Sequence, residues 1–596
     1  MKNLSLNFNE TASTIKDVSF KDVVIIGNGP SGISLSYFLA GNLPYWKPED
    51  IKSHPDELLK ARLTYLDASK SLMEHDLYSL THGLEGRTTN PVSILFDSLQ
   101  HPGADLGIKL QSMLKYKHFK DKEIDHVVLG KGKPGGSWHR MDPNLRTLSL
   151  SAWMSLPNLN FDEWEQQYQS SLEYEIDESS DNSQKIEEKH PSDRYLRSIS
   201  EEVKTRALVA SVAEYYENYV HLMNLDKFFR NDTIVVSIRQ VKENEKFNNS
   251  KLENANWIVH GYDKASKRPF IIGCKKVVMA NGGSDLVNRL GVRGENKSLS
   301  WLKYELPLLE SSIENVKEGE KIQMKPVMIV GAGLSAADAV IACRNAGINV
   351  IHVFRGVAGG FLGLPQTYFP EYNMVYNMMK DPKTNYEFYQ PLPESTLKEI
   401  KSSNGKHLVT VQSLRSEECQ TFDVSYCAIL IGSRPDLSLL QHLNNFSPAR
   451  QIVSTTLNEN PSENIAIRAL RRFKIFCEKC KHLNLCFGIK NRNIIINSLI
   501  DDDNCCTKDC SMRKSCQCDR LLNDKKLKCD ERGVGFGEDP TKPVDCKNNP
   551  IAVNKFTNEL LHVPGVYALG PLVGDNFVRF IAGGALSIAS TFLNEK

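Results

Sequence analysis

The feature that most constrains the fold is a strand–turn–helix signature that occurs twice, about three hundred residues apart. Each copy begins with four consecutive apolar residues, 23–26 and 327–330, and continues into a turn of small residues. Such apolar runs are typical of buried parallel strands, and turns with this glycine spacing hold the pyrophosphate of a dinucleotide. The sequence therefore predicts an α/β fold with two Rossmann-like dinucleotide-binding domains. The small residues stand at Gly27, Gly29, Gly32, Gly331, Gly333 and Ala336.

In the first turn each glycine has a separate role. Gly27 permits the tight bend, Gly29 lets the backbone approach the pyrophosphate, and Gly32 lets the helix pack close to the strand. The helix begins at Pro30 and Ser31, so its N-terminal N–H groups are expected to face the phosphates.

The segment after the first helix departs from the usual βαβ unit. The second strand is expected only at 125–129, and residues 42–122, which read as helical or irregular, form an insertion before it. The strand runs into Gly130 and Lys131, without the carboxylate that usually holds the ribose hydroxyls. We therefore expect a weakened ribose contact at this site.

The second turn carries a signal for the type of nucleotide. Ser335 lies at the start of its helix, and the next strand, 350–354, ends in Arg355. A guanidinium at this position suits the 2′-phosphate of NADPH, through charge-assisted bidentate bonds. The alternative is an ordinary surface arginine at a strand end.

Two aromatic segments are candidates for covering a ligand. Gly135 and Gly136 let a loop run close to a ligand, and Ser137 and Trp138 follow, with the Trp ring able to pack beside it. A plain turn with a core Trp is the alternative. A small-residue stretch around Trp153 suits the covering of a flat ring.

The C-terminal region supplies a carboxylate. A strand at 565–569 leads to Gly574 and Asp575 and then to a Gly- and Ala-rich helix start. In flavoproteins such a carboxylate bonds the ribityl or pyrophosphate region, and the helix N-terminus faces the isoalloxazine edge. This segment needs a flavin partner, so the first turn is assigned to FAD and the second to NADPH.

These assignments place the NADPH domain inside the FAD domain. The predicted boundaries are 1–20 for a disordered tail, 21–310 for the first part of the FAD domain with its 42–122 insertion, 311–423 for the NADPH domain, and 424–596 for the second part of the FAD domain with a Cys-rich insertion at 470–550.

Ten of the fourteen cysteines lie between Cys477 and Cys546. Close pairs among them could build a tetrahedral zinc site that stabilises a loop-rich insert. Their spacing matches no familiar zinc finger, and reduced or redox-sensitive thiols are the alternative. The candidate zinc ligands are Cys477, Cys480, Cys516 and Cys518.

Charge and hydropathy exclude several classes of protein. Lys plus Arg number 73 and Asp plus Glu number 72, so no general nucleic-acid surface is indicated. No apolar run of about 18 residues predicts a membrane span. The first twenty residues are polar and lack the features of a signal peptide, so a cytoplasmic location is the default expectation.

The chain resembles the flavin-containing and N-hydroxylating monooxygenases in the order of its two turns, its Gly-Gly-Ser-Trp loop and its closing Gly-Asp helix. More specifically, it is similar to the oxidative stress-induced growth inhibitor family. The resemblance covers most of the chain from residue 21 onward and leaves out the Cys-rich segment. It is carried by residues 84–87, 90–92, 95–97, 126–130, 134–139, 153–157 and 568–585.

The resemblance implies FAD and NADPH binding, monooxygenase activity and a link to cell growth, division and death. In such a reaction NADPH reduces FAD, the flavin forms a C4a-hydroperoxide with O2, and one oxygen atom passes to a substrate. The longer Phe-x-Gly-x3-His fingerprint of related monooxygenases is absent between 285 and 325, so NADPH oxidation is better supported than oxygen transfer. The alternatives are an oxidase or reductase that releases peroxide, and a non-catalytic regulator with protein partners. The sequence identifies neither a catalytic residue nor the substrate, whether small molecule or protein.

Overall fold

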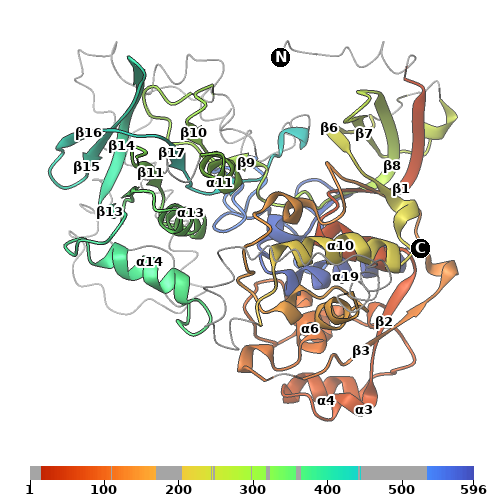
Figure 1. The fold of residues 1–596 in the computed structure, drawn as a ribbon. Coiled ribbons are helices and arrows are strands. Elements are labelled where there is room, and N and C mark those ends of the chain that lie inside the picture. Colours follow the sequence, from red (N-terminus) through yellow and green to blue (C-terminus); the bar gives the residue numbers. More distant parts are fainter. Residues whose placement is uncertain are drawn as a thin grey trace, which may run out of the picture.

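The computed structural model arranges the chain in two sheet-based units, with the insertion of residues 42–122 packed against the first (Figure 1). The residues that the structure describes are 15–108, 110–168, 205–242, 245, 249–296, 298–316, 323–356, 364–440, 443 and 533–595.

The first unit is organised around β1 (Asp17–Ile26), the strand that enters the first predicted turn. It pairs in parallel with β4 (His126–Leu129) on one side and with β8 (Pro269–Met279) on the other. The strand expected at 125–129 is therefore β4, the direct neighbour of β1 despite the insertion between them. The sheet continues in parallel through β5 (Phe229–Arg230) beside β4 and β19 (Val566–Ala568) beside β8.

Strand β8 belongs to two arrangements. Its first half pairs antiparallel with β7 (Trp257–Asp263), which pairs in turn with β6 (Thr233–Gln240). Its second half pairs with β19. The resulting three-stranded meander covers one face of the parallel sheet, while helices cover the other. Because both faces are covered here, the last four residues of β1 before the turn are apolar and buried.

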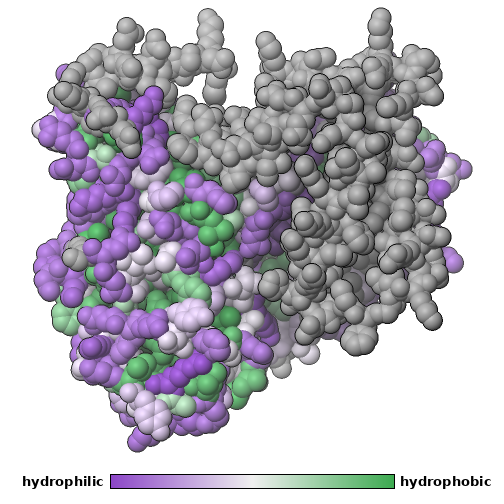
Figure 2. Space-filling model, turned by 180° about the vertical axis from the view of Figure 1, so that it is seen from behind, coloured by the Kyte–Doolittle hydropathy of each residue, from purple (hydrophilic) through white to green (hydrophobic). Residues whose placement is uncertain are grey.

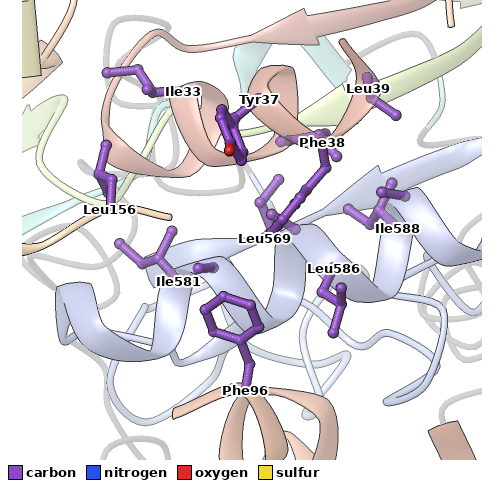
Figure 3. Packing of buried hydrophobic residues seen from close by; sticks show 14 of the residues in the cluster. Ile33, Tyr37, Phe38, Leu39, Phe96, Leu156, Leu569, Ile581, Leu586 and Ile588 are labelled. Atoms are coloured by element: carbon purple, nitrogen blue, oxygen red, sulfur yellow. The ribbon is translucent and has the colours of Figure 1, made fainter. Parts of the chain in front are cut away.

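The insertion contributes to the core of the first unit. Its helix α6 (Pro91–Gln100) packs on α19 (Val578–Asn594), which lies between α6 and α2 (Pro30–Leu39) (Figure 3). The two helices approach closely at Gly583, where a Cβ atom would lie 2.3 Å from Ser93 Cα. The insertion is thus built into the helical layer behind the first turn.

The prediction that residues 42–122 are only helical or irregular is wrong in one respect. β2 (Asn42–Trp46) and β3 (Leu114–His118) form an antiparallel pair at the two ends of the insertion. Pro44 reads as a turn residue in the sequence, but β2 has β3 as its one partner in the described residues, and an edge strand tolerates proline. The other helices of the insertion are α3 (Pro48–Ile51), α4 (Glu57–Tyr65) and α5 (Leu77–Thr81).

The second unit repeats the parallel arrangement. Its central strand, β11 (Val327–Val330), enters the second predicted turn and is followed by α13 (Leu334–Asn345). Helices α11 and α14 pack with α13 in one core, and an antiparallel sheet packs on the opposite side of the parallel strands. The remaining elements are β10 (Leu302–Lys303), α11 (Leu306–Glu314), β12 (Val350–Val353), α14 (Pro370–Lys380), β13 (Tyr389–Leu392), β14 (Ser395–Ser403), β15 (Lys406–Ser413), β16 (Cys419–Asp423) and β17 (Cys427–Ile429).

The second unit extends beyond the predicted 311–423 at both ends. β10 precedes residue 311 and β17 follows residue 423, yet both belong to the second sheet. The chain passes between the units twice, through β9 (Leu286–Val287) and β18 (Ser433–Arg434), and these two short strands pair antiparallel. The two crossings therefore run side by side.

Where Figure 2 colours the surface by hydropathy, hydrophilic and hydrophobic residues are mixed. Among the described residues, no helix is both long enough and apolar enough to cross a membrane.

Candidate nucleotide-binding site

A cavity of about 1820 Å³ lies at the carboxyl ends of β1, β4 and β8 and reaches the start of α13. Crevices at the carboxyl ends of parallel strands are where open α/β sheets bind ligands. Of the residues predicted from the sequence, those that line this cavity are Gly27, Gly29, Pro30, Ser31, Gly136, Ser137, Trp138 and Ser335.

The three glycines of the first turn have different surroundings. Gly27 has a φ of +118°, and a Cβ atom on it would lie 2.2 Å from the Ala280 carbonyl oxygen. A Cβ atom on Gly32 would lie 2.0 Å from the carbonyl oxygen of Gly27. A Cβ atom on Gly29 would meet its nearest atom only at 3.9 Å. Close packing within the protein thus requires glycine at positions 27 and 32, whereas the open side of Gly29 leaves room for a ligand.

The Gly-Gly-Ser-Trp loop is joined to this turn. The Gly135 N–H donates to the Asn28 carbonyl oxygen at 2.8 Å, and a Cβ atom on Gly136 would lie 3.2 Å from Gly29 Cα. Trp138 is half-buried and contacts Tyr216 of α10 (Val209–Leu222) edge to face. The first glycine turn and the Gly-Gly-Ser-Trp loop therefore meet backbone to backbone at Gly29 and Gly136. Together they form one wall of the cavity.

The end of β4 is filled by an asparagine. Asn28 Nδ2 donates to the Gly132 carbonyl oxygen at 2.7 Å and to Asn231 Oδ1 at 2.9 Å. A Cβ atom on Gly130 would lie 2.0 Å from Asn28 Nδ2. The position where a ribose-binding carboxylate usually stands is thus occupied by the side chain of the turn itself.

A carboxylate from the loop after β8 reaches the same edge of the sheet. Asp285 follows β8 and pairs with Lys131 at 3.0 Å, and its Oδ2 atom is buried with no hydrogen-bond partner among the described residues. Arg140 lies 3.9 Å from the same carboxylate. All three side chains line the cavity. No periodic pattern in the sequence indicates Asp285, because it lies in the loop beyond the strand.

The second turn repeats the packing of the first. Gly331 has a φ of +138°, and a Cβ atom on it would lie 2.3 Å from the Leu430 carbonyl oxygen, whereas the side of Gly333 is open. Buried His352 contacts the Gly331 carbonyl oxygen through Nε2 at 2.7 Å. A carbonyl can only accept, so Nε2 carries the proton and Nδ1 accepts from the Tyr389 hydroxyl at 2.9 Å. Burial lowers the pKa of His352 to about 4, which keeps this support neutral.

Arg355 is exposed directly after β12 and Phe354, and it lies outside the lining of the cavity. Its position at the strand end is the one from which a guanidinium can reach a nucleotide held on the second turn. The role in NADPH recognition therefore stays a prediction.

Two predicted flavin contacts lie elsewhere. Asp575 is fully buried, and it accepts from Thr88 Oγ1 at 2.5 Å and from Ser93 Oγ at 2.8 Å. Trp153 packs against the Arg579 guanidinium, 4.4 Å from its ring centroid. Neither residue lines the cavity, because the partners of Asp575 come from the insertion and the partner of Trp153 comes from α19. Gly32, Gly135, Gly331, Gly333, Ala336 and Gly574 also lie outside the lining.

The C-terminal part of the predicted Cys-rich insertion forms another wall. Asp539 and residues 542–549 line the cavity, although the sequence analysis places them inside an insertion ending at 550. Buried Asn549 holds this loop together through its Nδ2 atom, which donates to the carbonyl oxygens of Asp539, Lys542 and Pro543 at 3.1, 3.2 and 3.0 Å. This wall packs into the core of the first unit through Val544 and Cys546.

The chain is 30% identical over 607 residues to human oxidative stress-induced growth inhibitor 2, with 97% of this chain and 94% of the relative covered. It is 32% identical over 585 residues to oxidative stress-induced growth inhibitor 1 of Mus musculus, with 96% of this chain and 95% of the relative covered. The chain belongs to the oxidative stress-induced growth inhibitor family. No protein-family model matches it.

Among solved structures, this member of the growth inhibitor family is similar to a bacillithiol disulfide reductase from Bacillus cereus. The identity is 12%, the TM-score is 0.47, and 97% of this chain and 100% of the reductase are covered.

The four candidate zinc ligands, Cys477, Cys480, Cys516 and Cys518, lie outside the described residues of this growth inhibitor family member. Within the part that the structure describes, no group of three or more His, Cys, Asp or Glu side chains could hold a metal ion. Zinc binding in the Cys-rich segment stays a prediction.

A cluster of carboxyl groups lies where the two units meet. Glu310 of α11 shares a hydrogen bond with Asp142, which follows the Gly-Gly-Ser-Trp loop. Burial, together with the Asp142 carboxylate, raises the pKa of Glu310 to about 8. Burial likewise raises the pKa of Asp338 in α13 to about 7, against the hydrogen bond from Tyr372. The junction is thus sensitive to the protonation of its carboxyl groups.

We expect Glu310→Gln to stabilise the protein at alkaline pH. Folded Glu310 keeps its proton up to about pH 8, whereas its ordinary pKa is 4.5. The folded state therefore binds more protons between these values, and this group's contribution to stability falls as pH rises through them. The amide removes this fall, so the gain in melting temperature should grow from pH 5.5 to pH 8.5, by about 2–4 °C per kcal/mol of relieved repulsion. Exposed Glu387→Gln is the control, and an equal gain at both pH values would contradict the expectation.

Proposed function

We propose that the chain is an FAD- and NADPH-dependent oxidoreductase that acts as a monooxygenase and takes part in growth inhibition. The single observation that carries the proposal is the shared cavity: two glycine turns of the same construction, on two separate parallel sheets, belong to units that meet at one cavity of about 1820 Å³. Small-molecule pockets are commonly about 300–1,000 Å³, so this cavity suits two extended nucleotides. The names of the two relatives support the part about growth.

The residues present fit an FAD molecule on the first turn. Gly29 leaves backbone open to the cavity, which a pyrophosphate needs, and Gly136 lets the second loop lie close beside it. Basic side chains outnumber acidic ones in the lining, with lysine or arginine at positions 131, 133, 140, 264, 434, 542 and 547 and aspartate at positions 285, 436, 539 and 545. The buried, unpaired Oδ2 atom of Asp285 is an acceptor suited to ribose hydroxyls.

This chain's own residues supply binding and orientation. The N-terminus of α2 lies beside Gly29, so its N–H groups stabilise phosphate charge. Val578 and Ile581 of α19, together with Trp138, form an apolar part of the lining suited to a flat ring and to the exclusion of water. FAD, when bound, supplies hydride acceptance from NADPH and the activation of O2 for transfer of one oxygen atom.

The test is anaerobic mixing of the purified full-length protein with NADPH. Bound flavin should be visible in the absorbance spectrum, and NADPH should bleach it. Readmission of O2 with measurement of peroxide then separates an oxidase from a monooxygenase, which releases little peroxide in the presence of its substrate. A protein without flavin, or one whose flavin NADPH does not bleach, would refute the proposed enzyme.

We expect Arg355→Ala to lower the preference for NADPH over NADH. A lost charge-assisted bond of about 1.5–3 kcal/mol corresponds to a loss of about 10- to 100-fold in the affinity for NADPH, with the affinity for NADH unchanged. Titration of flavin bleaching with each nucleotide measures both. Arg415→Ala removes another exposed arginine of the same unit, paired with Glu394 at 2.5 Å, and should change neither affinity. An unchanged preference in Arg355→Ala would show that another residue reads the 2′-phosphate.

A further inference from the structure

One arginine is buried between the two units. Arg206 is 1% exposed and lies just before α10, in a segment that belongs to the first unit. On its own side, Nε donates to the Thr147 carbonyl oxygen at 2.7 Å and Nη2 donates to the Arg146 carbonyl oxygen at 3.4 Å. The Thr147 N–H donates back to the Ala207 carbonyl oxygen at 2.9 Å. The guanidinium is therefore held in a fixed direction by the first unit.

The other contacts of this guanidinium belong to the second unit. Nη1 donates to the Tyr368 carbonyl oxygen and to Glu371 Oε1, both at 2.8 Å. The guanidinium carbon lies 4.4 Å from the centroid of the Phe369 ring. Tyr368 and Phe369 directly precede α14 and Glu371 lies in its first turn, and the inner side of this helix is part of the core of the second unit. Arg206 thus joins the two units with one planar group.

Opening this junction is unfavourable. Loss of the Glu371 partner would leave the charge of the buried Arg206 guanidinium uncompensated, which is unfavourable. Units of this kind move relative to each other by default unless their interface is strong. A guanidinium presents donors in a rigid fork, which lysine does not, so lysine keeps the charge at this position without keeping the geometry.

The junction connects to both walls of the cavity. On the second unit, Tyr372 of α14 donates to Asp338 of α13 at 2.8 Å, and α13 begins beside Ser335 in the cavity lining. On the first unit, Arg146 and Thr147 follow closely after Met141, which also lines the cavity. A shift at Arg206 therefore moves one wall against the other.

We propose that Arg206 is a positioning residue that fixes the second unit against the first, so that electrons pass between the two nucleotides without a rotation of the units. The inference rests on the proposed function for its catalytic part. Small misplacements of reacting groups reduce rates about 100-fold, so a fixed distance between the two turns is a direct requirement of hydride transfer.

The test is Arg206→Lys in the full-length protein. We expect the limiting rate of anaerobic flavin reduction at saturating NADPH to fall about 10- to 100-fold. The dissociation constant for NADPH and the rate of reduction by dithionite should stay within about twofold, since neither depends on the arrangement of the two units. The matched control is Arg239→Lys, which weakens a bidentate pair with Glu245 inside the meander, at 2.7 and 2.9 Å.

Hydrogen exchange supplies a second readout that does not need bound nucleotide. Arg206→Lys should speed exchange in residues 145–149 and 368–380 and leave exchange in β6 to β8 unchanged. Arg239→Lys should leave exchange in residues 145–149 and 368–380 unchanged. Faster exchange at the junction together with a wild-type rate of NADPH-driven reduction would overturn the positioning role. Unchanged exchange at the junction would show that Arg206 does not hold the two units together. If the wild-type protein holds no reducible flavin, the proposed function fails, and hydrogen exchange alone decides whether Arg206 holds the two units together.

Discussion

Replacing Gly27 by alanine is expected to prevent most of the protein from folding. The residue has a φ of +118°, and the added Cβ atom would lie 2.2 Å from the Ala280 carbonyl oxygen. Backbone strain at such a position costs about 1–3 kcal/mol, and the clash with a neighbouring strand end adds to it. Because the contact is with backbone, no side chain can move aside. Soluble yield and the melting temperature measure the effect.

The matched control lies two residues away. The backbone of Gly29 is extended, with φ −75° and ψ −175°, and a Cβ atom there would have its nearest neighbour at 3.9 Å. Gly29→Ala should therefore fold with a melting temperature near that of the wild type, yet lose flavin, because the methyl group occupies the space of the pyrophosphate. A Gly29→Ala protein with normal flavin content would show that the first turn does not hold a pyrophosphate. A stable Gly27→Ala protein would show that the turn is less tightly packed than its geometry implies.

The second large effect is expected for Asp575→Ala. Asp575 joins the C-terminal segment to the insertion, since both of its oxygens accept from hydroxyls near the start of α6, those of Thr88 and Ser93. Burial raises its pKa to about 6, so at pH 7.5 a carboxylate accepts these bonds. Truncation leaves the buried Ser93 hydroxyl and the half-buried Thr88 hydroxyl without this acceptor, and a buried unpaired group costs about 1–3 kcal/mol.

This variant separates two roles for the same residue. If Asp575 holds the insertion, Asp575→Ala lowers the melting temperature strongly, and the molecules that stay folded bind flavin with normal affinity. If it bonds the flavin instead, the affinity falls while the melting temperature of the flavin-free protein stays near that of the wild type. Asp575→Asn should retain most of the stability, because its amide still accepts one bond and can donate to a hydroxyl. Fluorescence titration with FAD beside thermal unfolding measures both quantities.

The insertion takes on a definite role in this view. It packs α6 on α19 where Gly583 leaves no room for a side chain, and it fixes Asp575. Val578, the first residue of α19, and Asn576 just before the helix in turn line the cavity. Segments far apart in the sequence thus support one wall of the site, which argues against an insertion that serves only as a surface for protein partners.

Local patterns determined much of this protein. The apolar runs at 23–26 and 327–330 with their glycines predicted two parallel sheets, and the strand at 125–129 was identified across a long insertion. These features are readable because strand burial and turn geometry depend on neighbours close in the sequence. The tight bends expected at Gly27 and Gly331 are present, with φ of +118° and +138°, although the carbonyl oxygens packed against them, those of Ala280 and Leu430, come from distant segments.

Tertiary structure alone decided what those turns face. Asp575 and Trp153 are directed by partners that are distant in the sequence, Thr88 and Ser93 for the first and Arg579 for the second. Asp285 and the loop of Asn549 enter the cavity, and Arg206 joins the two units, through contacts that leave no periodic trace. The physical reason is that a strand or a turn is fixed by short-range sterics and burial, whereas the neighbours of a side chain are fixed by how whole elements pack.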